Sequence, residues 1–150
     1  HAHGSRFDVT GTRDMTHCAG LGTAIDYQLE IGWQDKIRPY SLALAQYLRT
    51  LVLDEIEGAV MTIPEGPEMS GFLTSFYIEG VSLRRMREIM WQDYKIQIAT
   101  TGANGRPIFR ISTHFYDSFD DIDRFVDTLK DIISNRRDEL EDDRKNRKGR

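Results

Sequence analysis

The sequence has one cysteine, Cys18, among its 150 residues. A lone thiol excludes an internal disulfide framework, and the lack of a CxxC pair excludes a cysteine-based zinc site. No hydrophobic run approaches the length of a membrane span, and no signal peptide is recognisable. These absences favour a globular protein of the reducing cytoplasm.

An excess of positive charge is also missing, since 20 Lys and Arg face 24 Asp and Glu, a formal net charge of −4. Such a balance argues against nucleic-acid binding through phosphate neutralisation. Three arginines in a predicted helix, Arg84, Arg85 and Arg87, are therefore interpreted as a solvated face. At this length the chain suits one compact unit, with residues 1–5 as a tag or cloning remnant and residues 136–150 as a charged tail.

Hydrophobic periodicity predicts the order α-α-β-β-α-β-β-α. This order predicts an α+β fold in which helices cover one face of a largely antiparallel four-stranded sheet. Asn104-Gly105 is typical of a two-residue hairpin turn between the last two strands. The predicted helices are 15–31, 39–56, 82–92 and one that follows Ser118; the predicted strands are 59–63, 71–78, 95–100 and one that contains Arg110.

The stretch from Arg106 to Asp121 is the most informative part of the chain. Its first half alternates as a strand does and places Arg110 on the face opposite Phe109. Ser118 and Asp121 then have the spacing of a capping box, which starts an amphipathic helix. Two interpretations of Arg110 stay open: a structural ion pair or exposed sheet residue, and the recognition of an anion by its planar guanidinium.

No complete catalytic constellation is visible in the sequence. His17 and His114 lie in different predicted elements, and neither Cys18 nor any hydroxyl has a base at a suitable spacing. The acidic residues after Ser118 are favourable charges at a helix N-terminus, so no metal site is expected. Two features stand out: the Gly11-Thr12 turn, where an amide and a hydroxyl can hold a phosphate, and Arg110, which suits a carboxylate.

These two features also mark a family resemblance. GTRD at Gly11–Asp14, with the helix AGLGTAIDYQLEIGW at Ala19–Trp33, resembles the GT-containing loop and following helix of class V aminotransferase-like, pyridoxal-phosphate-dependent enzymes. NGRPIFRISTHFYDSFDDIDRFVDTL at Asn104–Leu129 resembles the closing segment of the same enzymes. The GTRD residues and the RIS triplet at Arg110–Ser112 resemble the isopenicillin-N-epimerase-like branch more than cysteine desulfurases, which tend to have proline after the GT.

The resemblance implies the C-terminal part of a fold-type-I enzyme, inactive alone. Residues 6–33 would be the end of the large domain with a linking helix, and residues 34–135 the small α+β domain. The partners implied are the N-terminal large domain, a second copy in a homodimer and an amino-acid substrate, with no nucleic acid or membrane.

The resemblance also implies roles for the two features. Thr12, with Gly11, would contact the phosphate of pyridoxal 5'-phosphate, Arg110 would bind the substrate α-carboxylate, and the role of Arg13 stays open. The lysine that carries the cofactor in the family precedes the GT loop, so no catalytic residue is expected here. The lysines present, none of them in that context, are Lys36, Lys95, Lys130, Lys145 and Lys148.

The reaction stays open among aminotransferase, epimerase and C–S lyase types, because groups outside this chain would select it. An alternative from another class is a non-catalytic α+β ligand-binding or protein-interaction domain. In that alternative the apolar helix at 19–31 is the docking face.

Overall fold

The computed structural model describes residues 16–64, 66, 69, 71–103 and 106–140. The chain divides into two compact units, residues 1–37 and residues 38–150. Among the described residues, no helix has both the length and the apolar character that crossing a membrane requires.

The described part of the first unit is helical. Helix α2 spans Thr16–Glu30, close to the predicted helix, and none of its side chains is buried. Gly32 follows with a φ of 86°, a left-handed conformation that glycine adopts without steric cost. A short π-helix, η1 (Trp33–Ile37), then closes on the Gly32 carbonyl oxygen, which accepts hydrogen bonds from the amides of Lys36 and Ile37.

The second unit is built on four strands, β1 (Ala59–Met61), β2 (Leu73–Ile78), β3 (Ala99–Ala103) and β4 (Arg106–Ser112). They form one sheet in the order β1-β2-β4-β3, and each neighbouring pair is antiparallel. The β3–β4 register pairs Ala103 with Arg106, which agrees with the predicted hairpin, although Asn104 and Gly105 lie outside the described residues. The predicted sheet is confirmed.

The predicted start of the third strand at Lys95 was wrong, because β3 begins at Ala99. Lys95 takes a left-handed conformation, with a φ of 59°, at the end of the preceding helix. The amide of Ile96 donates to the carbonyl oxygen of Met90, so this segment completes the helix terminus instead of pairing in the sheet.

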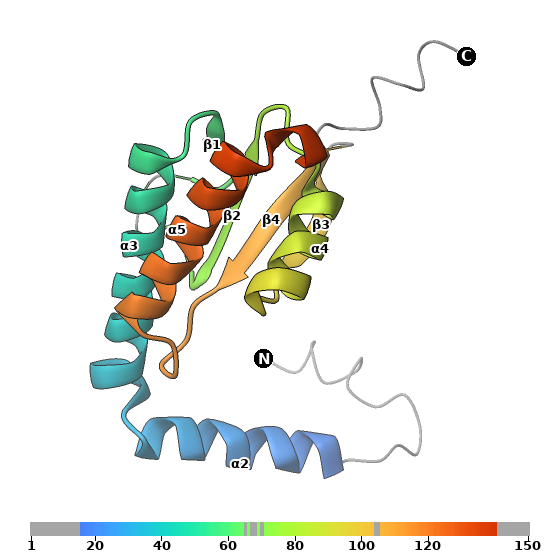
Figure 1. Cartoon of the computed structure of the whole chain (residues 1–150). Coiled ribbons are helices and arrows are strands. Elements are labelled where there is room, and N and C mark those ends of the chain that lie inside the picture. Colours follow the sequence, from blue (N-terminus) through green and yellow to red (C-terminus); the bar gives the residue numbers. More distant parts are fainter. Residues whose placement is uncertain (1–15, 65, 67–68, 70, 104–105, 141–150) are drawn as a thin grey trace. The chain divides into compact units, whose positions relative to one another are not determined.

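Helices α3 (Arg38–Glu55), α4 (Leu83–Tyr94) and α5 (Phe119–Asn135) lie over the same face of the sheet (Figure 1). The rings of Phe76 and Phe109 stack beneath them with centroids 4.9 Å apart. Together with these rings the helices bury one continuous apolar cluster, so the α+β fold predicted from the sequence is confirmed. Fully buried members of the cluster include Leu44, Leu48, Val52, Met86, Met90, Leu129 and Ile132.

The chain beyond α5 differs from the charged tail expected for residues 136–150. Arg137–Leu140 forms a 3₁₀ helix, η3, and Leu140 is buried in the core. The Leu140 carbonyl oxygen also accepts a hydrogen bond of 2.7 Å from the Ser82 amide. Residues 141–150 lie outside the described residues.

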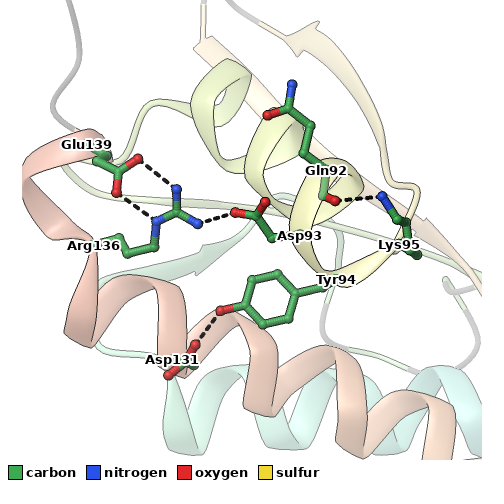
Figure 2. Close-up of polar contacts among 7 residues, drawn as sticks. All are labelled: Gln92, Asp93, Tyr94, Lys95, Asp131, Arg136 and Glu139. Carbon is green, nitrogen blue, oxygen red and sulfur yellow. Dashed lines mark hydrogen bonds and ion pairs between the residues drawn. The ribbon is translucent and has the colours of Figure 1, made fainter.

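Polar contacts on the surface join α4, α5 and η3 (Figure 2). The guanidinium of Arg136 donates to both carboxylate oxygens of Glu139, at 2.7 and 2.8 Å, and pairs with Asp93 of α4. The hydroxyl of Tyr94 donates to Asp131 of α5. Because these side chains are exposed or half-buried at the surface, we expect them to contribute much less stability than the apolar cluster.

Helix α5 begins with the predicted capping box. The Ser118 Oγ accepts from the Asp121 amide at 3.2 Å, and an Asp121 carboxylate oxygen accepts from the Ser118 amide at 2.9 Å. The hydrogen bonds from the Ser118 hydroxyl and amide lower the pKa of Asp121 below its ordinary value of 3.8. A depressed carboxylate pKa adds stability above the unfolded-state pKa, and that stability is lost as the pH falls through the folded-state pKa.

Asp121→Asn is therefore expected to lower the melting temperature at pH 7 and to flatten the loss of stability on acidification. Asp120→Asn is the matched control, since it removes a charge from the same helical turn without breaking the box. Thermal melts at pH 7 and at pH 3 should show the two variants diverging at pH 7 and converging at pH 3. Equal melting temperatures of the two variants at pH 7 would contradict the role of the box.

Candidate functional site

Arg110 lies on the face of the sheet that is opposite the core. In the register, Arg110 pairs with Ser75 of β2 and Ala99 of β3, whereas its neighbour Phe109 pairs with Phe76 in the stacked core. Because successive side chains of a strand point to opposite faces, Arg110 is turned away from the apolar cluster. Its side chain is exposed, as the exposed-face interpretation of the sequence allowed.

The structural ion pair considered for Arg110 is not observed. No residue that the structure describes forms an ion pair or a side-chain hydrogen bond with the Arg110 guanidinium. An arginine presents five N–H donors in a planar fork, and no described side chain occupies those of Arg110, so they are suited to an anion.

Arg110 lines a cavity of about 760 Å³ in the second unit. The segment before β3 forms one wall through Ile96 and Ile98, and the end of β4 forms another. The turn after β4 and the first turns of α5 complete the lining through Tyr116, Asp117, Asp121, Ile122 and Phe125. The cavity thus combines apolar walls with a few charged groups, which is typical of small-molecule sites.

Both carboxylates of the cavity are already engaged in local structure. Asp117 accepts a hydrogen bond of 2.7 Å from the His114 amide. Asp121 accepts from the amide and the hydroxyl of Ser118 in the capping box. Of the charged side chains that line the cavity, Arg110 alone has no partner among the described residues, and it is therefore the candidate ligand-binding group.

An aromatic turn follows β4 beside the cavity. The rings of His114 and Tyr116 stack with centroids 4.8 Å apart, and Phe115 contacts both rings. Tyr116 is 75% exposed although it lines the cavity, so its ring is available to a ligand.

Helix α3 and Phe72, the residue before β2, hold this turn in place. The Thr113 hydroxyl lies 3.1 Å from the Ser41 carbonyl oxygen and 3.2 Å from that of Phe72. The Tyr40 hydroxyl donates to the Asp117 carbonyl oxygen at 2.9 Å. These long-range bonds fix the end of β4, and with it the surroundings of Arg110.

Gly11 and Thr12, as well as Arg13, lie outside the described residues. Cys18 is exposed on α2. Within residues 16–64, 66, 69, 71–103 and 106–140, no group of three His, Cys, Asp or Glu side chains is arranged to hold a metal ion.

Sequence reasoning missed a second arginine that shapes the sheet. Arg49 of α3 is only 7% exposed, and its guanidinium donates to the Thr74 hydroxyl at 3.3 Å and the Gly71 carbonyl oxygen at 2.9 Å. Burial lowers the pKa of Arg49. The helical period of α3 could have identified Arg49, because it lies eight residues after Ser41 on the buried side of this helix.

Comparisons with known proteins show which proteins the chain is similar to. No protein-family model matches the chain. Isopenicillin N epimerase from Streptomyces clavuligerus is 30% identical over 125 residues, which cover 83% of this chain and 31% of that protein. Isopenicillin N epimerase from Amycolatopsis lactamdurans is 28% identical over 126 residues, with the same coverage of 83% and 31%. The chain thus spans about a third of the length of these curated relatives.

Solved structures share the fold of this chain. Cysteine desulfurase from Thermococcus onnurineus NA1 has a TM-score of 0.67 at 19% identity, over 83% of this chain and 32% of that one. A NifS-like protein has a TM-score of 0.64 at 18% identity, over 83% of this chain and 35% of that one. The chain matches a C-terminal part of the class V pyridoxal-phosphate enzymes. The family resemblance drawn from the GT loop and the closing segment is confirmed.

The relatives among the class V enzymes, the epimerases and the desulfurases, are pyridoxal-phosphate-dependent. Both curated relatives are named isopenicillin N epimerase, and this is the branch that the GTRD and RIS residues favoured. The structural likeness to the desulfurases lies below 20% identity, so it shows the fold alone.

Proposed function

We propose that this chain is the C-terminal region of a pyridoxal-phosphate-dependent enzyme that acts on an amino acid, and that Arg110 binds the substrate α-carboxylate. The observation that carries the proposal is that Arg110 lines a cavity whose two acidic groups are already engaged, while its guanidinium has no partner among the described residues. A planar guanidinium binds a carboxylate through two parallel, charge-assisted hydrogen bonds, which fix orientation as well as affinity.

Bound pyridoxal phosphate would supply an electron sink for the bonds at the substrate α-carbon. The residues of this chain would contribute orientation: Arg110 holds the carboxylate, and the exposed ring of Tyr116 limits the space beside it. Which of transamination, epimerisation or C–S cleavage follows is selected by groups outside this chain.

The cofactor contacts proposed for this chain are those of Thr12 and Gly11 with the phosphate, in a homodimer where Thr12 reaches the cofactor of the neighbouring subunit. A hydroxyl and free amides beside a glycine turn suit an anion chemically. A cytoplasmic location is part of the same proposal and is supported by the single cysteine. The covalent attachment of the cofactor is assigned to a lysine upstream, because no lysine of this chain has the family's sequence context and none of the described lysines lines the Arg110 cavity.

Borohydride reduction in the presence of pyridoxal phosphate, followed by peptide mass spectrometry, tests the proposed function. The complete polypeptide is expected to give one stoichiometric adduct, on a lysine upstream of the GT loop. This chain alone is expected to give only sub-stoichiometric, scattered labelling, because its lysines lack the family context. A single stoichiometric adduct on one lysine of this chain, or a complete polypeptide without any adduct, would refute the proposal.

A further inference from the structure

Two neutral residues, Gln97 and Ala99, line the cavity beside Arg110. Ala99 is the register partner of Arg110 on β3, and side chains that face each other in an antiparallel pair have β-carbons about 5 Å apart. The side chain of Ala99 is a single methyl group, and the residue is exposed. The surface over Ala99 is therefore low and open, and a ligand bound to the Arg110 guanidinium can lie on it.

The two neighbours of Gln97 fix its orientation. Ile98 is a buried member of the apolar cluster and Ile96 packs against the same cluster, whereas Gln97 between them is exposed. The Gln97 side chain is therefore turned away from the core, as the Arg110 side chain is. The hydrogen bond from the Ile96 amide to the Met90 carbonyl oxygen anchors the backbone just before Gln97.

Gln97 takes a position diagonal to Arg110. It precedes Ala99 by two residues, and residues two apart along an extended segment face the same side. In a regular antiparallel ladder, diagonal neighbours are about 7–8 Å apart, a separation that long side chains span. In the described part of the chain, the Gln97 side chain has no hydrogen-bond partner. Its two N–H donors are thus available to a ligand on Arg110.

The acidic groups of the cavity belong to a different wall. Asp117 lies in the turn after β4, and Asp121 lies in the first turn of α5, the helix over the core face of the sheet (Figure 1). Gln97 and Ala99 come from the segment that leads into β3, and both are exposed. On this side of Arg110, a negatively charged ligand therefore meets a neutral amide and a methyl group.

We propose that Gln97 is a second binding residue for the carboxylate held by Arg110, and that Ala99 is the floor of this site. The guanidinium donates to both carboxylate oxygens, and the Gln97 amide donates to one of them. A neutral donor beside the arginine adds a direction to the contact without adding charge. The inference deepens the proposed function, because it rests on Arg110 as the carboxylate-binding residue.

Gln97→Glu in the complete polypeptide tests the donor, with propionate as the probe. The substitution keeps the size of the side chain but replaces its N–H donors by a negative charge that competes for Arg110. We expect the dissociation constant of propionate to rise at least about tenfold. Propionamide, the neutral counterpart of propionate, should bind to the variant no more weakly than to the unsubstituted protein. Ligand-observed NMR titrations measure both dissociation constants.

Gln92→Glu is the matched control for this substitution. Gln92 is an exposed residue of α4 and is absent from the cavity lining, so the dissociation constant of propionate should stay the same. Equal effects of the two substitutions, or no effect of Gln97→Glu, would overturn the role of Gln97. A large loss of melting temperature in Gln97→Glu, or no binding of propionate to the unsubstituted protein, would overturn it as well.

Ala99→Val tests the floor of the site. Valine favours strands, so the melting temperature should be kept or raised, while the added methyl groups fill the space beside Arg110. Propionate should bind at least severalfold more weakly. Thr101→Val is the control, since Thr101 is exposed on the same side of β3 and lies outside the cavity lining. Unchanged binding to Ala99→Val, or an equal loss in Thr101→Val, would overturn the floor.

These titrations need no turnover and no cofactor chemistry. Failure of the proposed function would appear as a missing lysine adduct in the borohydride test. Failure of the present inference would leave that adduct in place, together with the kinetic effect of Arg110→Lys. The two proposals therefore fail separately.

Discussion

Arg110→Lys in the complete enzyme is expected to lower kcat/KM for the amino-acid substrate by roughly ten- to a hundred-fold, while cofactor binding barely changes. Lysine keeps the positive charge but loses the planar fork, so one of two parallel bonds to the carboxylate disappears. A hydrogen bond to a charged group contributes ~1.5–3 kcal/mol, which corresponds to the expected fall in kcat/KM.

Arg87→Lys is the control for this prediction. Arg87 is an exposed residue of α4 and is absent from the lining of the Arg110 cavity, so the same substitution should leave kcat/KM unchanged. Steady-state kinetics at limiting substrate, with cofactor content measured by absorbance, distinguish the variants. A loss of cofactor from the Arg110 variant, or equal kinetic losses in both variants, would contradict a specific carboxylate contact.

Leu129→Ala is expected to lower the free energy of unfolding of this chain by about 2–5 kcal/mol. Leu129 of α5 is fully buried, and its truncation both removes apolar contact and leaves a cavity where α5 meets the sheet and the other helices. Because α5 also lines the site through Ile122 and Phe125, the same change should loosen the surroundings of Arg110.

Leu53→Ala is the matched control for the core prediction. Leu53 is 54% exposed on α3, so the same substitution should change stability by no more than about 0.5 kcal/mol. Urea denaturation followed by circular dichroism measures both. Similar midpoints for the two variants would mean that α5 is not packed as described.

Local sequence patterns predicted most of this fold because they agree with its packing. The stripe in α5 recurs at the helical period, and its members Ile122, Phe125, Val126 and Leu129 are buried. The capping box at Ser118 was also visible, because both partners of the box lie within four residues.

The errors arose where long-range contacts decide the structure. Residues 95–98 alternate as a strand does, but Ile96 and Ile98 pack against the core beside the end of α4 without pairing in the sheet. Leu140 stands alone in a charged segment, so only its burial in the folded chain shows that the chain continues past α5 as an ordered element. Arg49 likewise finds its partners, Gly71 and Thr74, more than 20 residues away.

The candidate site was only partly accessible to sequence reasoning. Arg110 could be identified because a cation in the middle of an apolar strand is unusual, and alternation places it opposite Phe109. The cavity could not be predicted, because it is formed by segments that are distant in sequence: 96–99, the end of β4 and the start of α5. The cofactor contacts proposed for Gly11 and Thr12 also require the upstream domain.

The most direct test of the central claim is the ratio of kcat/KM for an amino acid to that for the corresponding amine without the carboxylate. It would be measured in the complete enzyme and in its Arg110→Lys variant, beside the melting temperature of the same variant of this chain. The account predicts that the ratio falls by roughly ten- to a hundred-fold in the variant, that the amine reacts similarly with both enzymes, and that the melting temperature is unchanged. An unaltered ratio together with a large loss of melting temperature would show that Arg110 is a structural residue and would contradict the assignment.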